Sequence, residues 1–138
     1  MLRYVFDCET NGLLHELDTV HSLVLRDIDS GDVTSCSDHD GYESIANGLY
    51  MLSKADVLVG HNVINFDCRA LKKVYKSFKL KKNCKIYDTL IVSRVLWPEL
   101  EPVDHQKFSH IPRKYIGKHS LGAWGERLNV KKINFEGA

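Results

Sequence analysis

The chain has 138 residues and a mass of 15.8 kDa, the size of one ordinary domain, which excludes a multidomain enzyme within this stretch. Hydrophobic residues make up 43%, a share typical of ordinary soluble proteins, which excludes collagen, a disordered tail and a coiled coil. Nineteen Lys and Arg against eighteen Asp and Glu leave a net charge of +1, so a polyanionic partner would have to be held locally, by a patch or by metal ions.

The cysteines and the apolar runs indicate the cellular compartment in which the protein is expected. Cys8, Cys36, Cys68 and Cys84 are widely spaced and form no Cys-x-x-Cys pair, so small buried thiols are expected rather than a zinc site or a disulfide framework. No run approaches the roughly 18 apolar residues that cross a bilayer, and the first residues do not form a secretory signal. A reducing cytoplasm and no membrane partner are therefore predicted.

Hydrophobic periodicity predicts the order of elements along the chain. Strands are expected at residues 2–6, 20–26, 33–36, 56–59 and 86–87, and helices at 42–54, 66–78, 89–96 and 120–128. The segment 98–118 carries three prolines and no clear period, so it is predicted as a long loop. This order predicts an α/β fold, a mixed β-sheet flanked by helices, and one domain over residues 1–138.

Two carboxylates follow the first predicted strand. Side chains alternate across a strand, so Asp7 and Glu9 project from one face while Cys8 points to the other. At about 6 Å and an effective dielectric near 20 their repulsion costs on the order of 3 kcal/mol. A hard divalent cation such as Mg²⁺ would remove this cost, whereas two acids at a solvated strand end would need no cation. The pair alone leaves both interpretations open.

A third carboxylate follows the strand at 56–59. Asp67 falls where the next helix is expected to begin, and if the first and fourth strands are neighbours it reaches the same strand end as Asp7 and Glu9. Three carboxylates at one place favour a metal site, although Asp67 could instead complement a helix N-terminus. In the loop between them, His61 is interpreted as a ligand, a base or a backbone-bonded histidine, and Asn62 as a phosphate contact or a turn cap.

These motifs resemble a known family. Asp-x-Glu-Thr-x-Gly-Leu at 7–13 and His-Asn-x₃-Phe-Asp at 61–67 look like the first two motifs of the DnaQ-like (DEDD) 3′–5′ exonucleases. Asp-Thr-Leu-Ile-Val-Ser-Arg at 88–94 and Lys-His-Ser-Leu-Gly-Ala-Trp-Gly-Glu-Arg-Leu at 118–128 resemble, more narrowly, the N-terminal proofreading domain of A-family DNA polymerases of short-tailed bacteriophages. The resemblance covers nearly the whole chain and implies an RNase H-like fold.

The resemblance also implies roles for individual residues. Asp7, Glu9 and Asp67 would be the catalytic metal ligands for two Mg²⁺ or Mn²⁺ ions: Asp7 between the two, Glu9 on the ion that carries the attacking water, and Asp67 on the second. The 3′ end of single-stranded DNA would be bound by four further residues, among which Leu13 and Phe66 could equally belong to the core: Thr10, Leu13, Asn62 and Phe66. A phage origin would place the protein in the cytoplasm of a bacterial host.

One motif of the family is missing. Its members carry a Tyr or His four residues before a fourth carboxylate near the C-terminus of the domain, and no Asp of this sequence has such a partner. We therefore expect either a C-terminally truncated exonuclease domain or a naturally split gene product. The expected partners are the rest of a polymerase or a second chain that supplies the last helix, or a second copy of this chain. The isolated chain is predicted to bind metal weakly and to hydrolyse DNA poorly.

Two other functions are compatible with the sequence. A non-catalytic module with the same fold would only bind DNA or a partner protein; the missing fourth carboxylate favours it, and the three acids present oppose it. A phosphatase-like site with one Mg²⁺ would use Asp7 as nucleophile. That chemistry requires a second Asp where Glu9 stands, together with a downstream lysine and acidic pair that residues 61–67 do not supply.

Overall fold

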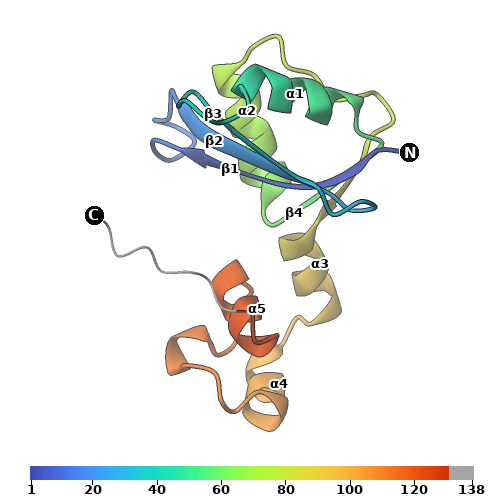
Figure 1. The fold of residues 1–138 in the computed structure, drawn as a ribbon. Coiled ribbons are helices and arrows are strands. Elements are labelled where there is room, and N and C mark those ends of the chain that lie inside the picture. Colours follow the sequence, from blue (N-terminus) through green and yellow to red (C-terminus); the bar gives the residue numbers. More distant parts are fainter. Residues whose placement is uncertain (131–138) are drawn as a thin grey trace. The chain divides into compact units, whose positions relative to one another are not determined.

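The computed structural model describes residues 1–130, and the chain divides into two units, Met1–Thr89 and Leu90–Ala138. The first unit contains a five-stranded sheet in the order β3-β2-β1-β4-β5 (Figure 1). Its strands are β1 (Arg3–Thr10), β2 (Val20–Asp27), β3 (Val33–Ser37), β4 (Val57–Gly60) and β5 (Lys85–Asp88). Strands β1, β2 and β3 pair antiparallel, whereas β4 and β5 run parallel to β1, so the predicted mixed sheet is confirmed.

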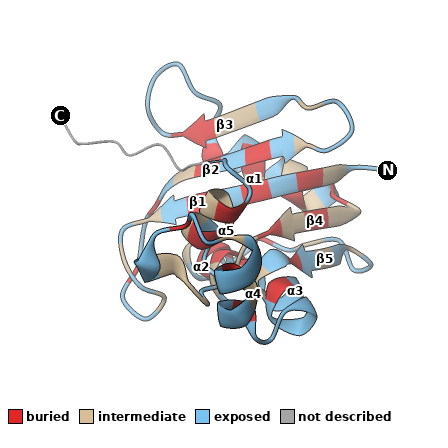
Figure 2. Cartoon of the chain, turned by 90° about the horizontal axis from the view of Figure 1, so that it is seen from below, coloured by how far each residue is buried: buried red, intermediate tan, exposed pale blue. Residues whose placement is uncertain are grey.

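Alternation along β1 decides which face of the sheet is packed. Tyr4, Phe6 and Cys8 are buried, and Val5, Asp7 and Glu9 on the other face are exposed, a pattern that Figure 2 shows in colour. Helices α1 (Ile45–Lys54) and α2 (Cys68–Val74) lie on the buried side of the sheet. The second face therefore carries the two acids of the first motif.

The connection between β4 and α2 is a single turn of π-helix, η1 (Val63–Asp67), preceded by Asn62 in the left-handed conformation at φ 61°. Helix α2 ends at Val74, so the helix predicted over 66–78 is wrong in its last turn. Phe78 is nevertheless buried, because a turn closed by its N–H on the Tyr75 carbonyl at 2.9 Å returns it to the core. An apolar stripe thus predicted burial correctly but not the end of the helix.

The second unit consists of short helices: α3 (Thr89–Leu96), which leads into it, α4 (Leu100–Lys107), a 3₁₀ turn η2 (Arg113–Tyr115) and α5 (Leu121–Arg127). Helix α4 lies within the segment that was predicted as a loop, and that prediction is wrong. Its sequence is mostly polar with Pro102 in the first turn, so no apolar period marks it. What holds α4 is the buried carboxylate of Asp104, which pairs with Arg127 of α5 at 2.7 Å.

Gly60, the last residue of β4, sits in close contact with two neighbours. A Cβ at this position would lie 2.2 Å from Cγ1 of Val63 and 2.9 Å from the carbonyl oxygen of Phe6. We expect Gly60→Ala to lower the free energy of unfolding by about 1–3 kcal/mol, as overpacking does in other cores. Urea denaturation measures this change. The control is Gly12→Ala, whose Cβ would meet only the flexible side chain of Glu16; an equal loss in both variants would contradict the packing argument.

Candidate active site

The candidate site is built on the C-terminal end of β1. Asp7 and Glu9 lie on the exposed face of this strand, and Cys8 between them is buried in the core. Strand β1 is central in the sheet, so its C-terminal end adjoins the loop that follows the parallel strand β4. That loop carries the second motif, residues 61–67, whose carboxylate is Asp67.

Asp67 reaches this strand end across 59 residues of sequence. Its carboxyl is only 4% exposed, and Oδ2 accepts a hydrogen bond from the backbone N–H of Cys8 at 2.9 Å. Asp7 is close enough to share a hydrogen bond with the same carboxyl, which lowers the pKa of Asp67. The predicted neighbourhood of the first and fourth strands is thus confirmed, and it brings Asp67 to the end of β1 that carries Asp7 and Glu9.

The Cys8 thiol is influenced by the charges of all three acids. Burial raises the pKa of Cys8 first, and the negative charge of Asp67 raises it further, followed by those of Asp7 and Glu9. All three carboxylates are therefore near enough to act on one sulfur atom. The thiol stays protonated and is a packing group rather than a nucleophile.

Burial also raises the pKa of Asp67, an effect that the hydrogen bonds from Cys8 and Asp7 only partly oppose. A carboxyl whose pKa is raised by folding binds its proton more tightly in the folded chain. Its contribution to stability is present below the unfolded pKa, near 3.8, and is lost as the pH rises through the folded value. At neutral pH the metal-free chain thus holds a destabilising buried charge at this position.

The predicted direction of the change of stability with pH can be tested with Asp67→Asn, whose side chain cannot ionise. In metal-free buffer we expect the variant to be more stable than the wild-type chain at pH 7, with the difference shrinking as the pH falls towards 4. Urea midpoints measured across this range, with EDTA present, give the comparison. A difference that stays constant with pH, or one of the opposite sign, would show that the Asp67 carboxyl is not the group responsible.

The donor set suits a hard cation. Carboxylate oxygens are the ligands that Mg²⁺ and Mn²⁺ prefer, and Mg²⁺ is commonly held by one or two carboxylates together with water and substrate phosphate. Within residues 1–130, no group of three or more His, Cys, Asp or Glu is arranged as a ready metal cage. Asp7 and Asp67 supply the two oxygens that such an ion requires, so the residues present fit it.

Thr10 and Leu13 lie one and four positions after Glu9. The hydroxyl of Thr10 donates to the carbonyl of Gly12 at 2.9 Å, which shapes the start of the loop between β1 and β2. Leu13 is 63% exposed in that loop, and its backbone N–H donates to Glu16 Oε1 at 3.2 Å. The side chain of Leu13 is therefore exposed and not part of the core.

Asn62 and Phe66 belong to the second motif itself. Asn62 precedes η1 with its backbone N–H bound to Asp88 Oδ1 at 2.9 Å, and Phe66, half-buried, donates its N–H to the carbonyl of Asn62 at 3.0 Å. His61 has its Nδ1 within 2.9 Å of the Thr89 hydroxyl. The sequence motifs gave Asp88 no role at the site. Its position at the end of a predicted strand, next to the loop of the second motif, was the feature that could have indicated one.

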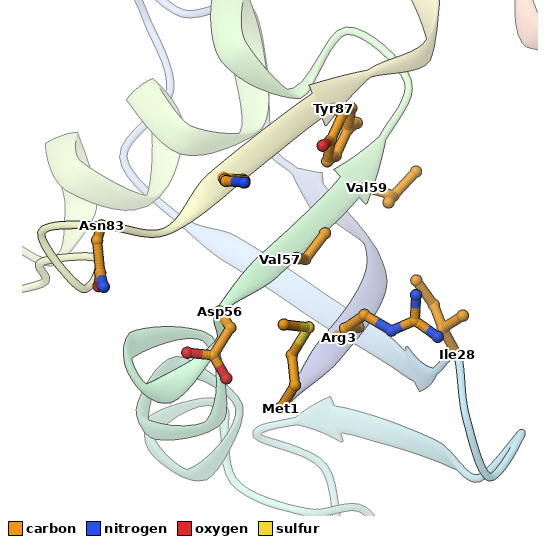
Figure 3. Close-up of a pocket in the computed structure, with 9 residues that line it drawn as sticks. Met1, Arg3, Ile28, Asp56, Val57, Val59, Asn83 and Tyr87 are labelled. Carbon is orange, nitrogen blue, oxygen red and sulfur yellow. The ribbon is translucent and has the colours of Figure 1, made fainter.

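A pocket on the exposed face of the sheet lies away from these acids. It has a volume of about 570 Å³ and is lined by β1, β4 and β5 near the start of β1, with Arg3, Val57, Val59 and Tyr87 around it (Figure 3). Arg3 pairs with Val57 at the opposite end of β1 from Asp7 and Glu9. The pocket is not the site that the motifs define.

The chain resembles known proteins in sequence and in structure. No known protein-family profile matches the sequence. The chain is 31% identical to the DNA-directed DNA polymerase of Escherichia phage T7 over 96% of its own length, and it spans about a fifth (20%) of that polymerase. None of the helices in the described part of the chain has the length and apolar character that crossing a bilayer requires.

Solved structures share the fold at low sequence identity. The zinc-bound complex of E. coli ExoI with single-stranded DNA superimposes with a TM-score of 0.60 at 15% identity, over 98% of this chain and 36% of that one. The family B DNA polymerase of the archaeon Pyrobaculum calidifontis gives a TM-score of 0.54 at 15% identity, over 94% of this chain and 22% of that one. The resemblance inferred from the motifs is confirmed: this chain is a sequence relative of the DNA polymerases of phages T7 and T3, with the RNase H-like fold of DnaQ-like exonucleases.

Proposed function

We propose that the chain is the exonuclease module of a phage-type DNA polymerase, a metal-dependent 3′–5′ DNA exonuclease that works in proofreading. The observation that carries this proposal is the bond from the Cys8 amide to the Asp67 carboxyl, which brings Asp67 to the strand that bears Asp7 and Glu9. Similarity to the phage T7 polymerase supports the polymerase context, and the ExoI complex, named for its single-stranded DNA, supports the substrate.

Asp7, Glu9 and Asp67 would hold divalent ions, Mg²⁺ or Mn²⁺, with two expected in the complete site. Bound there, such ions supply positive charge at the scissile phosphate and an activated water. The chain contributes the geometry: β1 holds Asp7 and Glu9 on one face, and the Cys8 amide fixes one oxygen of Asp67. With a net charge of only +1, the protein depends on bound cations rather than on its own field to hold a polyanion.

Four residues around the acids are proposed to bind the 3′-terminal nucleotide of the single strand. Thr10 is the last residue of β1 and Leu13 lies in the loop that follows, whereas Asn62 precedes η1 and Phe66 lies within it. The exposed Leu13 side chain offers an apolar surface for a base, and a half-buried aromatic such as Phe66 suits stacking. The rest of the polymerase, or a second chain, is the proposed protein partner.

The test is a cleavage assay on single-stranded oligonucleotides labelled at the 5′ end, with Mg²⁺ or Mn²⁺ and with EDTA as the metal-free control. A 3′–5′ exonuclease produces a ladder that shortens one nucleotide at a time from the 3′ end. An oligonucleotide with a blocked 3′ end is expected to resist. Calorimetric titration of the chain with Mn²⁺ measures metal binding separately from turnover.

The outcomes separate this function from a non-catalytic module. Metal-dependent shortening from the 3′ end supports the proposal even when turnover is slow. Retained binding of the oligonucleotide with no Mn²⁺ uptake and no cleavage would contradict it, and would favour a module that only binds DNA.

A further inference from the structure

Asp88 is a buried carboxylate of the first unit that accepts hydrogen bonds from two backbone N–H groups. It is the last residue of β5, pairs in register with Gly60 of β4, and is only 3% exposed. Its Oδ1 accepts from the backbone N–H of Asn62 at 2.9 Å, and its Oδ2 accepts from that of Ile64 at 3.0 Å. Both oxygens thus bind the segment that leads to Asp67.

These two bonds support the start of η1. The first N–H groups of a helical turn have no acceptor within the turn, and a carboxylate that receives them stabilises it. Asn62 is also in the left-handed region at φ 61°, a conformation that costs about 1 kcal/mol or more for a residue with a side chain. Asp88 satisfies the N–H groups on either side of Val63 and so fixes where η1 begins.

The same turn is fixed at its other end by β1. Asp67, the last residue of η1, binds the amide of Cys8 at 2.9 Å, and it lies three positions after Ile64. The five-residue turn is therefore held between Asp88 of β5 and Cys8 of β1. A shift at the Asp88 end is passed on to the Asp67 carboxyl, because only two residues separate Ile64 from Asp67 in one turn whose first residue, Val63, is packed in the core.

We propose that Asp88 is a positioning residue for the metal site: through the amides of Asn62 and Ile64 it sets the place of the Asp67 carboxyl relative to Asp7 and Glu9. This inference rests on the proposed function, and it assigns Asp88 no contact with metal or DNA. Groups that orient metal ligands in other proteins typically change metal affinity by about 10- to 100-fold when replaced.

The experiment compares two variants of Asp88 with a matched control in the full chain. Asp88→Asn keeps the size of the side chain but turns an acceptor into an NH₂ group, and Asp88→Glu keeps the charge but displaces the carboxyl. The control is Asp27→Asn, because Asp27 Oδ1 also accepts two backbone N–H groups, from Asp29 at 2.8 Å and Ser30 at 3.1 Å. Asp27 pairs with Tyr4, near the start of β1 and away from its acidic end.

The readouts are the Mn²⁺ dissociation constant by calorimetry and amide hydrogen exchange at Asn62 and Ile64, at a temperature where circular dichroism shows each variant folded. We expect both Asp88 variants to bind Mn²⁺ about tenfold more weakly and to exchange these two amides faster, with Asp27→Asn like the wild-type chain. A general loss of stability would not select these amides.

Three results would overturn the proposal. Wild-type Mn²⁺ affinity in Asp88→Asn would show that the turn holds Asp67 without this residue. Weakened binding in Asp88→Asn together with normal binding in Asp88→Glu would assign the effect to charge alone. An equal loss in Asp27→Asn would make it nonspecific. If the wild-type chain itself takes up no Mn²⁺, the proposed function fails, and the role of Asp88 at a metal site fails with it.

Discussion

Asp7→Asn is expected to lower the rate of 3′-end hydrolysis by about 100-fold or more, because charge stabilisation by a bound metal is worth several kcal/mol and each 1.36 kcal/mol changes a rate tenfold. Asp7 is the acid on β1 that also shares a hydrogen bond with Asp67, so it links the two halves of the site. The neutral amide keeps the shape of the side chain. The measurement is the initial rate of loss of the 3′-terminal nucleotide with saturating Mn²⁺.

The fold should survive this change, because Asp7 lies on the exposed face of β1. The urea midpoint of Asp7→Asn is expected to match that of the wild-type chain, since the Asn amide can still donate a hydrogen bond to the Asp67 carboxyl. Asp40→Asn serves as the control for charge, as Asp40 is an exposed acid in the segment before α1. A rate near wild type in Asp7→Asn, or a similar loss in Asp40→Asn, would argue against a metal site at β1.

The second large effect concerns the ion pair that holds the helices of the second unit together. Arg127 of α5 donates from Nε to Asp104 Oδ1 at 2.7 Å and from Nη2 to Oδ2 at 2.8 Å, with both side chains fully buried. The same guanidinium lies over the Trp124 ring at 4.7 Å and donates to the carbonyl of Lys118 at 2.7 Å, while Gly117 donates its N–H to Asp104. The pair thus ties α4, α5 and the loop between them.

Arg127→Met is expected to lower the free energy of unfolding of this unit by about 3–5 kcal/mol, because it leaves the Asp104 carboxylate buried without its partner. Tryptophan fluorescence followed in urea measures the loss selectively. The chain has two tryptophans, Trp97 and Trp124, and both lie in this unit with ring centroids 5.1 Å apart. An unchanged fluorescence midpoint would contradict the assigned role of the pair.

The double variant Asp104→Leu with Arg127→Met is the control for this loss. It removes both charges and a buried Arg127 nitrogen, Nη1, that has no hydrogen-bond partner in the described structure, so much of the stability should return. Arg127 holds the pKa of Asp104 below its usual range. The contribution of the wild-type pair is therefore present above the unfolded pKa near 3.8 and is lost as the pH falls through the folded value, and the double variant should lack this acid sensitivity.

Local patterns were sufficient to predict the sheet and half of the candidate site. Alternation from Tyr4 to Glu9 determines which residues of β1 are buried and places Asp7 and Glu9 on one face, because the period of a strand depends on backbone geometry alone. The start of the helix near Asp67 follows in the same way from apolar spacing. The fold class is confirmed for the same reason, since the order of elements limits the ways in which a sheet can be covered.

Local patterns failed where distant residues decide the structure. The polar helix α4 has no apolar stripe. It is stabilised by the ion pair between Asp104 and Arg127, which lies 23 residues further along the chain. The helix after η1 ends at Val74 although the apolar spacing continues to Phe78. Phe78 is buried because a turn, and not a further helical residue, leads it back to the core. In both cases a tertiary contact outweighs helix propensity, which is worth only tenths of a kcal/mol per residue.

The sequence by itself determined which carboxylates this protein offers and on which strand end the first two stand, because side-chain alternation and residue identity are local properties. Only the tertiary structure decided that Asp67 meets them, through the amide of Cys8, and that Asp88 holds the turn between. These contacts join residues 59, 26 and 24 positions apart. They depend on the parallel register of β1, β4 and β5, which no local pattern encodes.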